Sequence, residues 1–308
     1  MIFQEKEIVG DARNYTWVRV VNPSLEEINF LSERYHLEIS LIIDAMDPDE
    51  LARNETLTTT KGRLVIMRLP YAHPGKDFTH TTLTFSSFLL DDAGIVITVC
   101  KEHIAMFDQA IFNRDILYAP NLSCFVLNIL LYAGMEYLRY LKELKNIADS
   151  LEMQLDGAVH NQEVVNLMRI EKSLHYFKTS LRSNEILLEK IQKSPNWSWS
   201  AKEKELLDDV AIEMREAVEI SEIYLNILHS MAAAFASVTN NNVNQAMKRL
   251  TVISLVLMMP TVVASFFGMN VALPVSYTEN PLVFWVITAV SAAVSILMML
   301  ILRIRNFF

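Results

Sequence analysis

The first 120 positions mix short apolar runs typical of strands with short helical patterns. Four of these runs, at residues 16–21, 63–69, 81–89 and 95–100, are rich in the β-branched and aromatic side chains that favour strands. Ser24 is followed three positions later by Glu27, the capping-box pattern that opens a helix, and a second helix is predicted over residues 37–46. We therefore predict a small α/β domain over residues 1–120.

From residue 122 the apolar positions recur every three or four residues, as in an amphipathic helix. Residues 123–155 and 164–191 carry this pattern and predict a helical hairpin, turning around Gly157, within residues 121–195. Residues 196–259 contain neither Gly nor Pro, and a helix of that length would extend about 95 Å. Such a helix needs a partner or a membrane. We predict a stalk helix over residues 196–249 that continues directly into a membrane span.

Two uncharged apolar runs, residues 250–267 and 282–302, are each long enough to cross about 30 Å of hydrocarbon. The alternative, two buried core helices, is disfavoured because uncharged runs of this length are rare in soluble cores. Lys and Arg residues flank the pair of runs, and the link between them has none. The positive-inside bias then places both termini in the cytoplasm. The predicted segments are a membrane helix at 250–268, an external loop at 269–281, a second membrane helix at 282–302 and a cytoplasmic tail at 303–308.

Composition narrows the classes of function. The net charge of −9 argues against a phosphate-binding surface and so against nucleic acid as a partner. The N-terminus lacks a basic segment followed by an apolar core, so no cleaved signal peptide is expected. Cys100 and Cys124 have no spacing that requires a disulfide, which favours a reducing compartment. The seven histidines lack spacings such as H-E-x-x-H, and the seven glycines form no phosphate loop, so we do not expect an enzyme.

The polar residues of the first predicted span fall on one face of its helix. At about 100° per residue, its Thr and Ser side chains lie within about one quarter of the circumference. We call this face, with its neighbouring positions, the polar stripe; it comprises Asn244, Met247, Leu250, Thr251, Ser254, Met258, Thr261 and Ser265, with Gly268 at its border. Small hydroxylated residues also mark helix packing in lipid. The other interpretation is a pore lining, which requires several copies of the chain, because two spans cannot enclose a pore.

The segments Asn244-Gln245-Ala246-Met247-Lys248-Arg249-Leu250-Thr251, Met259-Pro260-Thr261 and Phe267-Gly268-Met269-Asn270 resemble the signature of the CorA family of magnesium transporters. The order of predicted elements along the whole chain resembles that family too. The resemblance implies an α+β cytoplasmic domain, a long helical stalk and two C-terminal membrane helices, assembled as a homopentameric funnel in the cytoplasmic membrane. It implies transport of hydrated Mg²⁺, with Co²⁺ and Ni²⁺ as further ions.

The resemblance also assigns roles to residues. Asn270 would form an amide ring at the outer mouth, on a turn shaped by Gly268 and Met269, and the polar stripe would line the pore. Asp44 and Asp209 resemble the acidic pair that binds regulatory Mg²⁺ between neighbouring subunits and closes the channel, and carboxylate oxygens suit that ion. The alternatives are a solvated acidic turn for Asp44 and a solvated stalk face for Asp209.

Three departures from the family pattern accompany these matches. No acidic residue follows Asn270 closely, since Glu279 is the only acid of the predicted loop. The basic tail holds only Arg303 and Arg305. Ala233 stands at a stalk position that is often acidic in the family. The remaining alternatives are a Zn²⁺ transporter of the same superfamily and a membrane-anchored sensor or scaffold without transport.

Overall fold

The computed structural model describes residues 4–11, 13–73, 80–109, 114, 116–153, 161–197, 199–269 and 282–304. Spatial contacts divide the chain into two units, Met1–Ala232 and Ala233–Phe308. Helix α6, Ala201–Phe267, begins in the first unit and ends in the second without a break. We describe each unit separately.

A six-stranded sheet forms the centre of the first unit, in the order β1-β2-β6-β5-β4-β3. The strands are β1 (Gln4–Ile8), β2 (Tyr15–Val21), β3 (Arg53–Thr56), β4 (Arg63–Ala72), β5 (His80–Leu90) and β6 (Ile95–Cys100). Only the β2–β6 pair is parallel among the described strands. The inner strands β4, β5 and β6 are buried almost throughout, which indicates that both faces of the sheet are covered.

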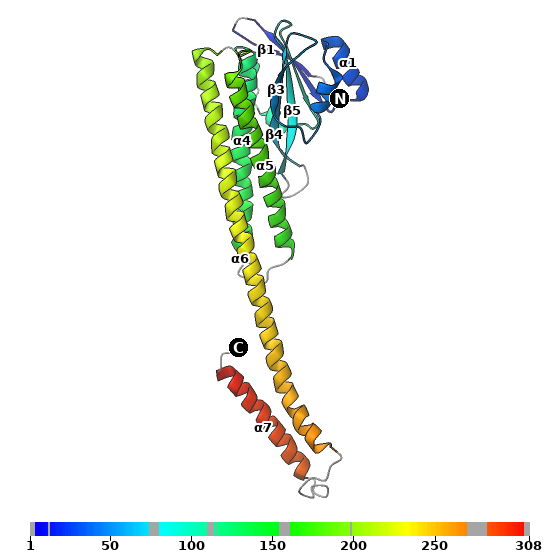
Figure 1. Ribbon diagram of the computed structural model, residues 1–308, viewed down its shortest axis with the longest axis vertical. Coiled ribbons are helices and arrows are strands. Elements are labelled where there is room, and N and C mark those ends of the chain that lie inside the picture. The colour runs from blue at the N-terminus through cyan, green and yellow to red at the C-terminus, as the bar shows by residue number, and fades with distance from the viewer. Residues whose placement is uncertain are drawn as a thin grey trace. The chain divides into compact units, whose positions relative to one another are not determined.

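Helices cover the two faces of this sheet (Figure 1). On one side lie α1 (Leu25–Tyr35) and α2 (Ile39–Asp44), whose Leu31 and Ile42 join a core with Ile66 of β4. On the other side lie α4 (Leu122–Met153) and α5 (Asn161–Lys193). There the Trp17 ring meets Phe125 of α4 edge-on, with ring centroids 5.4 Å apart. A single-turn helix, η1 (Ala105–Asp108), lies between β6 and α4 along the chain.

Side-chain hydrogen bonds fix α5 against the sheet. The Asn184 amide donates to the carbonyl of Arg68 at 2.7 Å, and its own oxygen accepts from the Arg68 backbone N–H at 2.9 Å. Ser183 and Ser173 accept from the backbone N–H groups of Ala52 and His80, respectively. These bonds satisfy backbone groups that would otherwise be buried without partners. They fix the register of α5 along the sheet.

Helix α6 begins with a capping box. The Ser200 hydroxyl accepts from the Glu203 backbone N–H, and the Glu203 carboxylate accepts from the Ser200 backbone N–H at 2.6 Å. Gly134 of α4 lies against α6, and a Cβ at this position would stand 3.2 Å from the Glu213 Cβ. The glycine thus permits a close crossing of α4 and α6.

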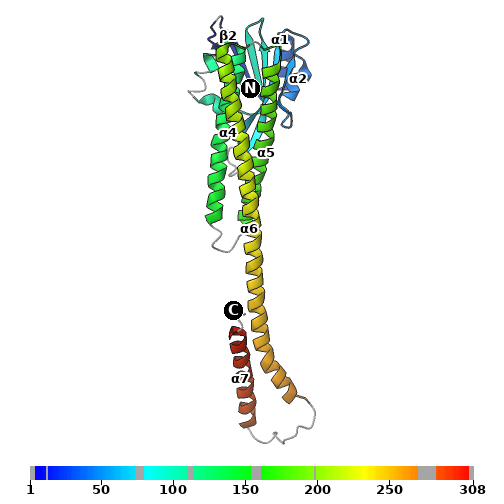
Figure 2. The ribbon, with the colours of Figure 1, turned by 60° about the vertical axis from the view of Figure 1, so that its left-hand side comes forward.

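The second unit contains the C-terminal part of α6 and α7 (Leu282–Ile304), which lie side by side (Figures 1 and 2). Both helices are long and apolar enough to span a membrane. Among the described residues of this unit, the buried hydrophobic side chains are Phe235 and Val252 of α6 and Leu302 of α7. Pro260 lies inside α6, where it removes one backbone hydrogen bond.

The strands and helices expected from the sequence are present, with shifted ends. The helix predicted from residue 196 begins at Ala201, because Ser200 caps it. Helix α6 ends at Phe267, and α7 runs two residues past the predicted 302. The turn around Gly157, the loop from Asn270 to Pro281 and the tail from Arg305 lie outside the described residues. Cys100 and Cys124 are buried free thiols.

Candidate functional site: the polar stripe and the acidic groups of the first unit

The polar stripe lies on an exposed part of the α6 surface in the single chain. Its eight members are all exposed, and Met247, Leu250 and Met258 are 62%, 65% and 58% exposed. On the opposite face, Val252 is 2% exposed, and Val256, Met259 and Val263 are partly covered. These residues lie about 180° around the helix from the stripe. The stripe is therefore free to contact further copies of the chain.

The two threonine hydroxyls of the stripe are arranged to accept hydrogen bonds. Thr251 donates its proton to the Met247 carbonyl at 2.8 Å, and Thr261 donates to the Leu257 carbonyl at 3.2 Å. A hydroxyl that has used its single proton in this way offers its oxygen only as an acceptor. Water around a cation points its protons outward, so such oxygens can bind a hydrated cation without removing its water.

Only part of the Gly-Met-Asn tripeptide belongs to the described residues. The Gly268 backbone N–H donates to the Ala264 carbonyl at 2.9 Å and closes the last turn of α6. Met269 is 54% exposed. Asn270 lies outside the described residues. Its role therefore stays a prediction from the sequence.

Asp44 ends α2 and is already paired within its own chain. Its carboxylate accepts from the Arg53 guanidinium at 2.8 Å, and the side chain remains 38% exposed. Arg53 also pairs with Glu50 and, at 2.7 Å, with Glu55. A cation that binds Asp44 must therefore share this carboxylate with Arg53 or displace it.

Arg68, which the sequence did not single out, holds the backbone of the acidic segment that follows Asp44. Its buried guanidinium donates to the carbonyls of Pro48 and Glu50 and, at 2.8 Å, to the hydroxyls of Thr82 and Thr84. Burial lowers the pKa of Arg68, while Tyr137, Asp49 and Asp47 act in the opposite direction. With these carbonyls directed inward, the Asp47 and Asp49 side chains of the loop remain exposed. A buried Arg on a strand gives no sequence signal for this role, because its partners come from distant segments.

Asp209 is exposed on α6 and lines a cleft of about 790 Å³. The cleft also includes Glu203 and Cys124. Burial acts to raise the pKa of Glu203, but hydrogen bonds from Ser200, Asn121 and Cys124 outweigh it, so the net pKa is lowered. Burial, followed by the nearby charge of Glu203, raises the pKa of Cys124 to about 11. The cleft thus holds a carboxylate that stays ionised and a thiol that stays protonated at neutral pH.

Asp209, Glu213 and Glu216 form an acidic face of α6, spaced by four and three residues. The pKa of Glu213 is raised, first by burial and then by the negative charges of Glu216 and Asp209. Such a shift means that ionising the group is disfavoured by its surroundings. A bound cation would relieve this repulsion.

Asp44 and Asp209 do not contact each other within one chain. Asp44 pairs with Arg53 at the end of α2, and Asp209 lines the cleft between α4 and α6.

The two long apolar helices and the large sheet-and-helix unit before them define the class: an integral membrane protein with two candidate spans and an extensive soluble unit. The family follows from the sequence match. Residues 12–303 match the family model of the CorA-like Mg²⁺ transporter protein, so the chain belongs to this family of membrane transporters. No catalytic activity is indicated for the family.

Relatives of this chain carry the same family name. The cobalt/magnesium transport protein CorA of Methanocaldococcus jannaschii is 23% identical over 301 residues, covering 96% of this chain and 92% of that protein. The magnesium transport protein CorA of Wolinella succinogenes is 24% identical over 273 residues, covering 83% and 80%. Both alignments include most of each protein, and the family match over residues 12–303 includes residues of both units.

Solved structures share the fold. The complete CorA magnesium transporter of M. jannaschii superposes with a TM-score of 0.81 at 20% identity, covering both chains entirely. The ZntB cytoplasmic domain of Vibrio parahaemolyticus gives 0.59 at 13% identity, covering 79% of this chain and 98% of that one. The predicted fold of the chain and its family are confirmed, and the pentameric assembly stays a prediction.

Proposed function

We propose that this protein forms an oligomeric channel that passes hydrated Mg²⁺ through the cytoplasmic membrane, with Co²⁺ and Ni²⁺ as further ions. The observation that carries the proposal is the polar stripe of α6, which is exposed along its length and lies opposite the partly covered face. Copies arranged around an axis with their stripes inward form an uncharged, oxygen-lined passage. Membership of a magnesium-transporter family supports the choice of ion.

An uncharged lining suits an ion that keeps its water. Mg²⁺ dehydrates reluctantly, and a ring of carboxylates would hold the bare ion tightly and release it slowly. The amide of Asn244 and the hydroxyls of Thr251 and Thr261 bind water rather than metal. Met247, Leu250 and Met258 provide apolar constrictions that close a pore by dewetting.

The membrane potential supplies the driving force. With both termini in the cytoplasm, a divalent ion that enters gains about 4.6 kcal/mol per 100 mV, twice the value for one elementary charge. Asn270 forms the outer mouth in this proposal. Since no acid follows it closely, its amide and nearby backbone carbonyls do most of the selecting.

Intracellular Mg²⁺ closes the channel by binding between subunits, with Asp44 of one copy and Asp209 of its neighbour as ligands. Two features support this role. The backbone of residues 47–50 is fixed by Arg68 and Thr84, so the acidic segment is preorganised. The raised pKa of Glu213 indicates a concentration of negative charge beside Asp209 that a cation would offset.

The experiment that tests the proposal is ion flux into liposomes that contain the purified full-length protein, with Mg²⁺, Co²⁺, Ni²⁺ and Zn²⁺ compared in parallel. Asn270→Ala should abolish Mg²⁺ flux. Asn280→Ala, which removes the other asparagine of the same loop, should retain it. Wild-type flux in Asn270→Ala would exclude the outer-mouth role. Flux of Zn²⁺ in preference to Mg²⁺ would assign the protein to the zinc-transporting alternative, and a chain inert to all four ions would be a membrane-anchored sensor or scaffold.

A further inference from the structure

A carboxylate and two imidazoles converge where α5 meets α6 in the first unit. Glu171 and His175 lie four residues apart on α5, and His229 reaches them from α6. One carboxylate oxygen, Glu171 Oε1, lies 3.9 Å from His175 Nε2 and 3.8 Å from His229 Nδ1. The three donor atoms all lie within 4.8 Å of one another. No other group of three or more His, Cys, Asp or Glu donors converges in this way among the described residues.

This geometry is close to that of a metal centre. With metal–nitrogen bonds of about 2.0–2.1 Å, donors around a tetrahedral zinc ion stand roughly 3.3 Å apart. The two separations from the carboxylate oxygen exceed that value by about half an ångström, and the two imidazole nitrogens lie within 4.8 Å of each other. Small side-chain rotations or a slight approach of the helices would close this gap. His175 and His229 are 56% and 57% exposed, so an ion can reach them from solvent.

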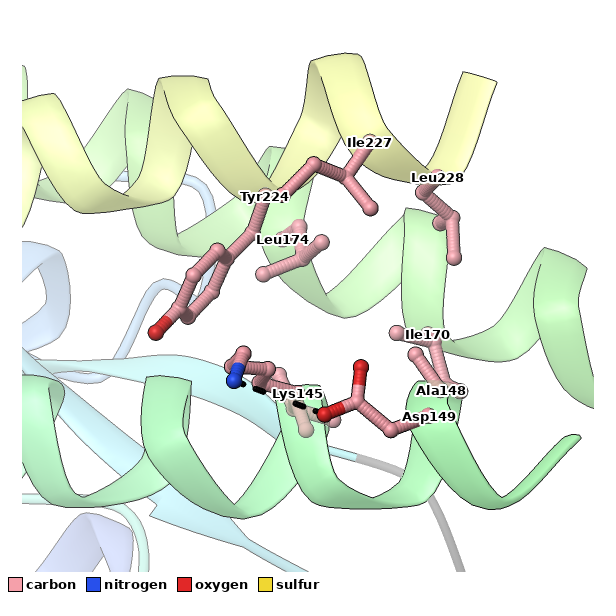
Figure 3. Close-up of a pocket in the computed structure, with 9 residues that line it drawn as sticks. Lys145, Ala148, Asp149, Ile170, Leu174, Tyr224, Ile227 and Leu228 are labelled. Carbon is pink, nitrogen blue, oxygen red and sulfur yellow. Dashed lines mark ion pairs between the residues drawn. The ribbon is translucent and has the colours of Figure 1, made fainter. Parts of the chain in front are cut away.

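The interior beneath the cluster leaves room for such an approach. A cavity of about 30 Å³ lies between α4, α5 and α6, and Figure 3 shows its lining. Each donor residue directly follows an apolar residue that lines this cavity: Glu171 follows Ile170, His175 follows Leu174, and His229 follows Leu228. The same helical turns therefore carry the donors outside and a packing gap inside. Helices around a gap can shift by a fraction of an ångström at lower cost than helices in a filled core.

We propose that Glu171, His175 and His229 form a binding site for a divalent transition-metal ion of the Zn²⁺, Co²⁺ or Ni²⁺ class, which links α5 to α6. Imidazole nitrogen favours these ions, whereas Mg²⁺ favours oxygen ligands alone. The site is thus chemically distinct from the acidic groups assigned to Mg²⁺. The three ligands leave at least one coordination position for water. Because α6 continues into the second unit, an ion here acts on the helix that carries the polar stripe.

The test is Co²⁺ binding to the full-length protein in detergent, purified without a polyhistidine tag and kept in excess Mg²⁺ to occupy oxygen-ligand sites. Visible absorption reports imidazole coordination of Co²⁺, which differs from that of the aqueous ion. We expect one Co²⁺ per chain and displacement by Zn²⁺. His229→Ala should weaken the affinity at least about tenfold, since even loss of a group that supports a ligand costs that much.

Two control variants separate a site from general effects. Lys178→Ala removes the neighbouring α5–α6 ion pair, Lys178 Nζ to Glu222 at 3.2 Å, without removing a donor. His103→Ala removes an exposed histidine elsewhere in the first unit. Both should bind Co²⁺ as the wild type does. Absence of the Co²⁺ bands in the wild type, or their full retention in His229→Ala, would overturn the proposal. Mg²⁺ flux by His229→Ala in buffer free of transition metals should equal that of the wild type, so failure of this site leaves the channel proposal separately testable.

Discussion

The carboxylate of Asp209 stands one turn before Glu213, a group whose ionisation its surroundings already disfavour. The negative charge around Asp209 has two possible roles: it binds a cation, or it only keeps the surface of the stalk helix solvated. The two roles differ in their response to Mg²⁺. A regulatory ligand changes the Mg²⁺ concentration at which the channel closes, whereas a solvated side chain does not.

Asp209→Ala should therefore leave the channel open at internal Mg²⁺ concentrations that close the wild type. The physical reason is the loss of one hard oxygen ligand, which weakens the interaction between subunits. The measurement is current or flux as a function of internal Mg²⁺. Asp208→Ala, at the adjacent exposed carboxylate, is the matched control and should leave the curve in place. An unchanged Mg²⁺ response in Asp209→Ala would exclude the regulatory role.

At the scale of elements, the crossing of α4 and α6 depends on Gly134. A Cβ there would already stand 3.2 Å from the Glu213 Cβ, so a larger side chain has no space unless the helices separate. Gly134→Leu should lower the stability of the protein by roughly 1–3 kcal/mol, the usual cost of overpacking. Thermal unfolding of the purified protein measures this effect. The control is Asn146→Leu, on the exposed side of α4, which should leave the melting temperature near the wild-type value. Equal melting temperatures for the two variants would show that α4 and α6 can separate at this crossing without loss of stability.

The elements also show why the sequence predicted some parts of the fold and not others. Strands β2, β4, β5 and β6 carry apolar, β-branched runs and were predicted. Strands β1 and β3 were missed because their sequences, QEKEI and RNET, are mostly polar, and they form as the edges of a sheet that already exists. Their pairing with β2 and β4 is a tertiary effect that local propensity does not record.

The candidate sites divide in the same way. The polar stripe was predictable because it follows the period of one helix, and the structure leaves it exposed. The partners of Arg68 and the cluster of Glu171, His175 and His229 were not, because they depend on which helices and strands become neighbours. Sequence periodicity identifies a face of one element, whereas a site built from two elements requires the fold.

At the scale of the whole molecule, the chain needs copies of itself, because two spans cannot surround an axis. We expect the purified protein to be a homopentamer, with a mass of about 176.5 kDa, five times 35.3 kDa, apart from bound detergent and lipid. Chemical cross-linking in detergent should give a ladder that stops at five chains, and native mass spectrometry should give the same number. A stable dimer would contradict the channel, since two copies of the stripe bury each other and leave no passage. Ser254→Arg should weaken the assembly of the pentamer. Each of the five chains would then place a guanidinium near the axis, where a small hydroxyl now lies, and these five positive charges would repel one another.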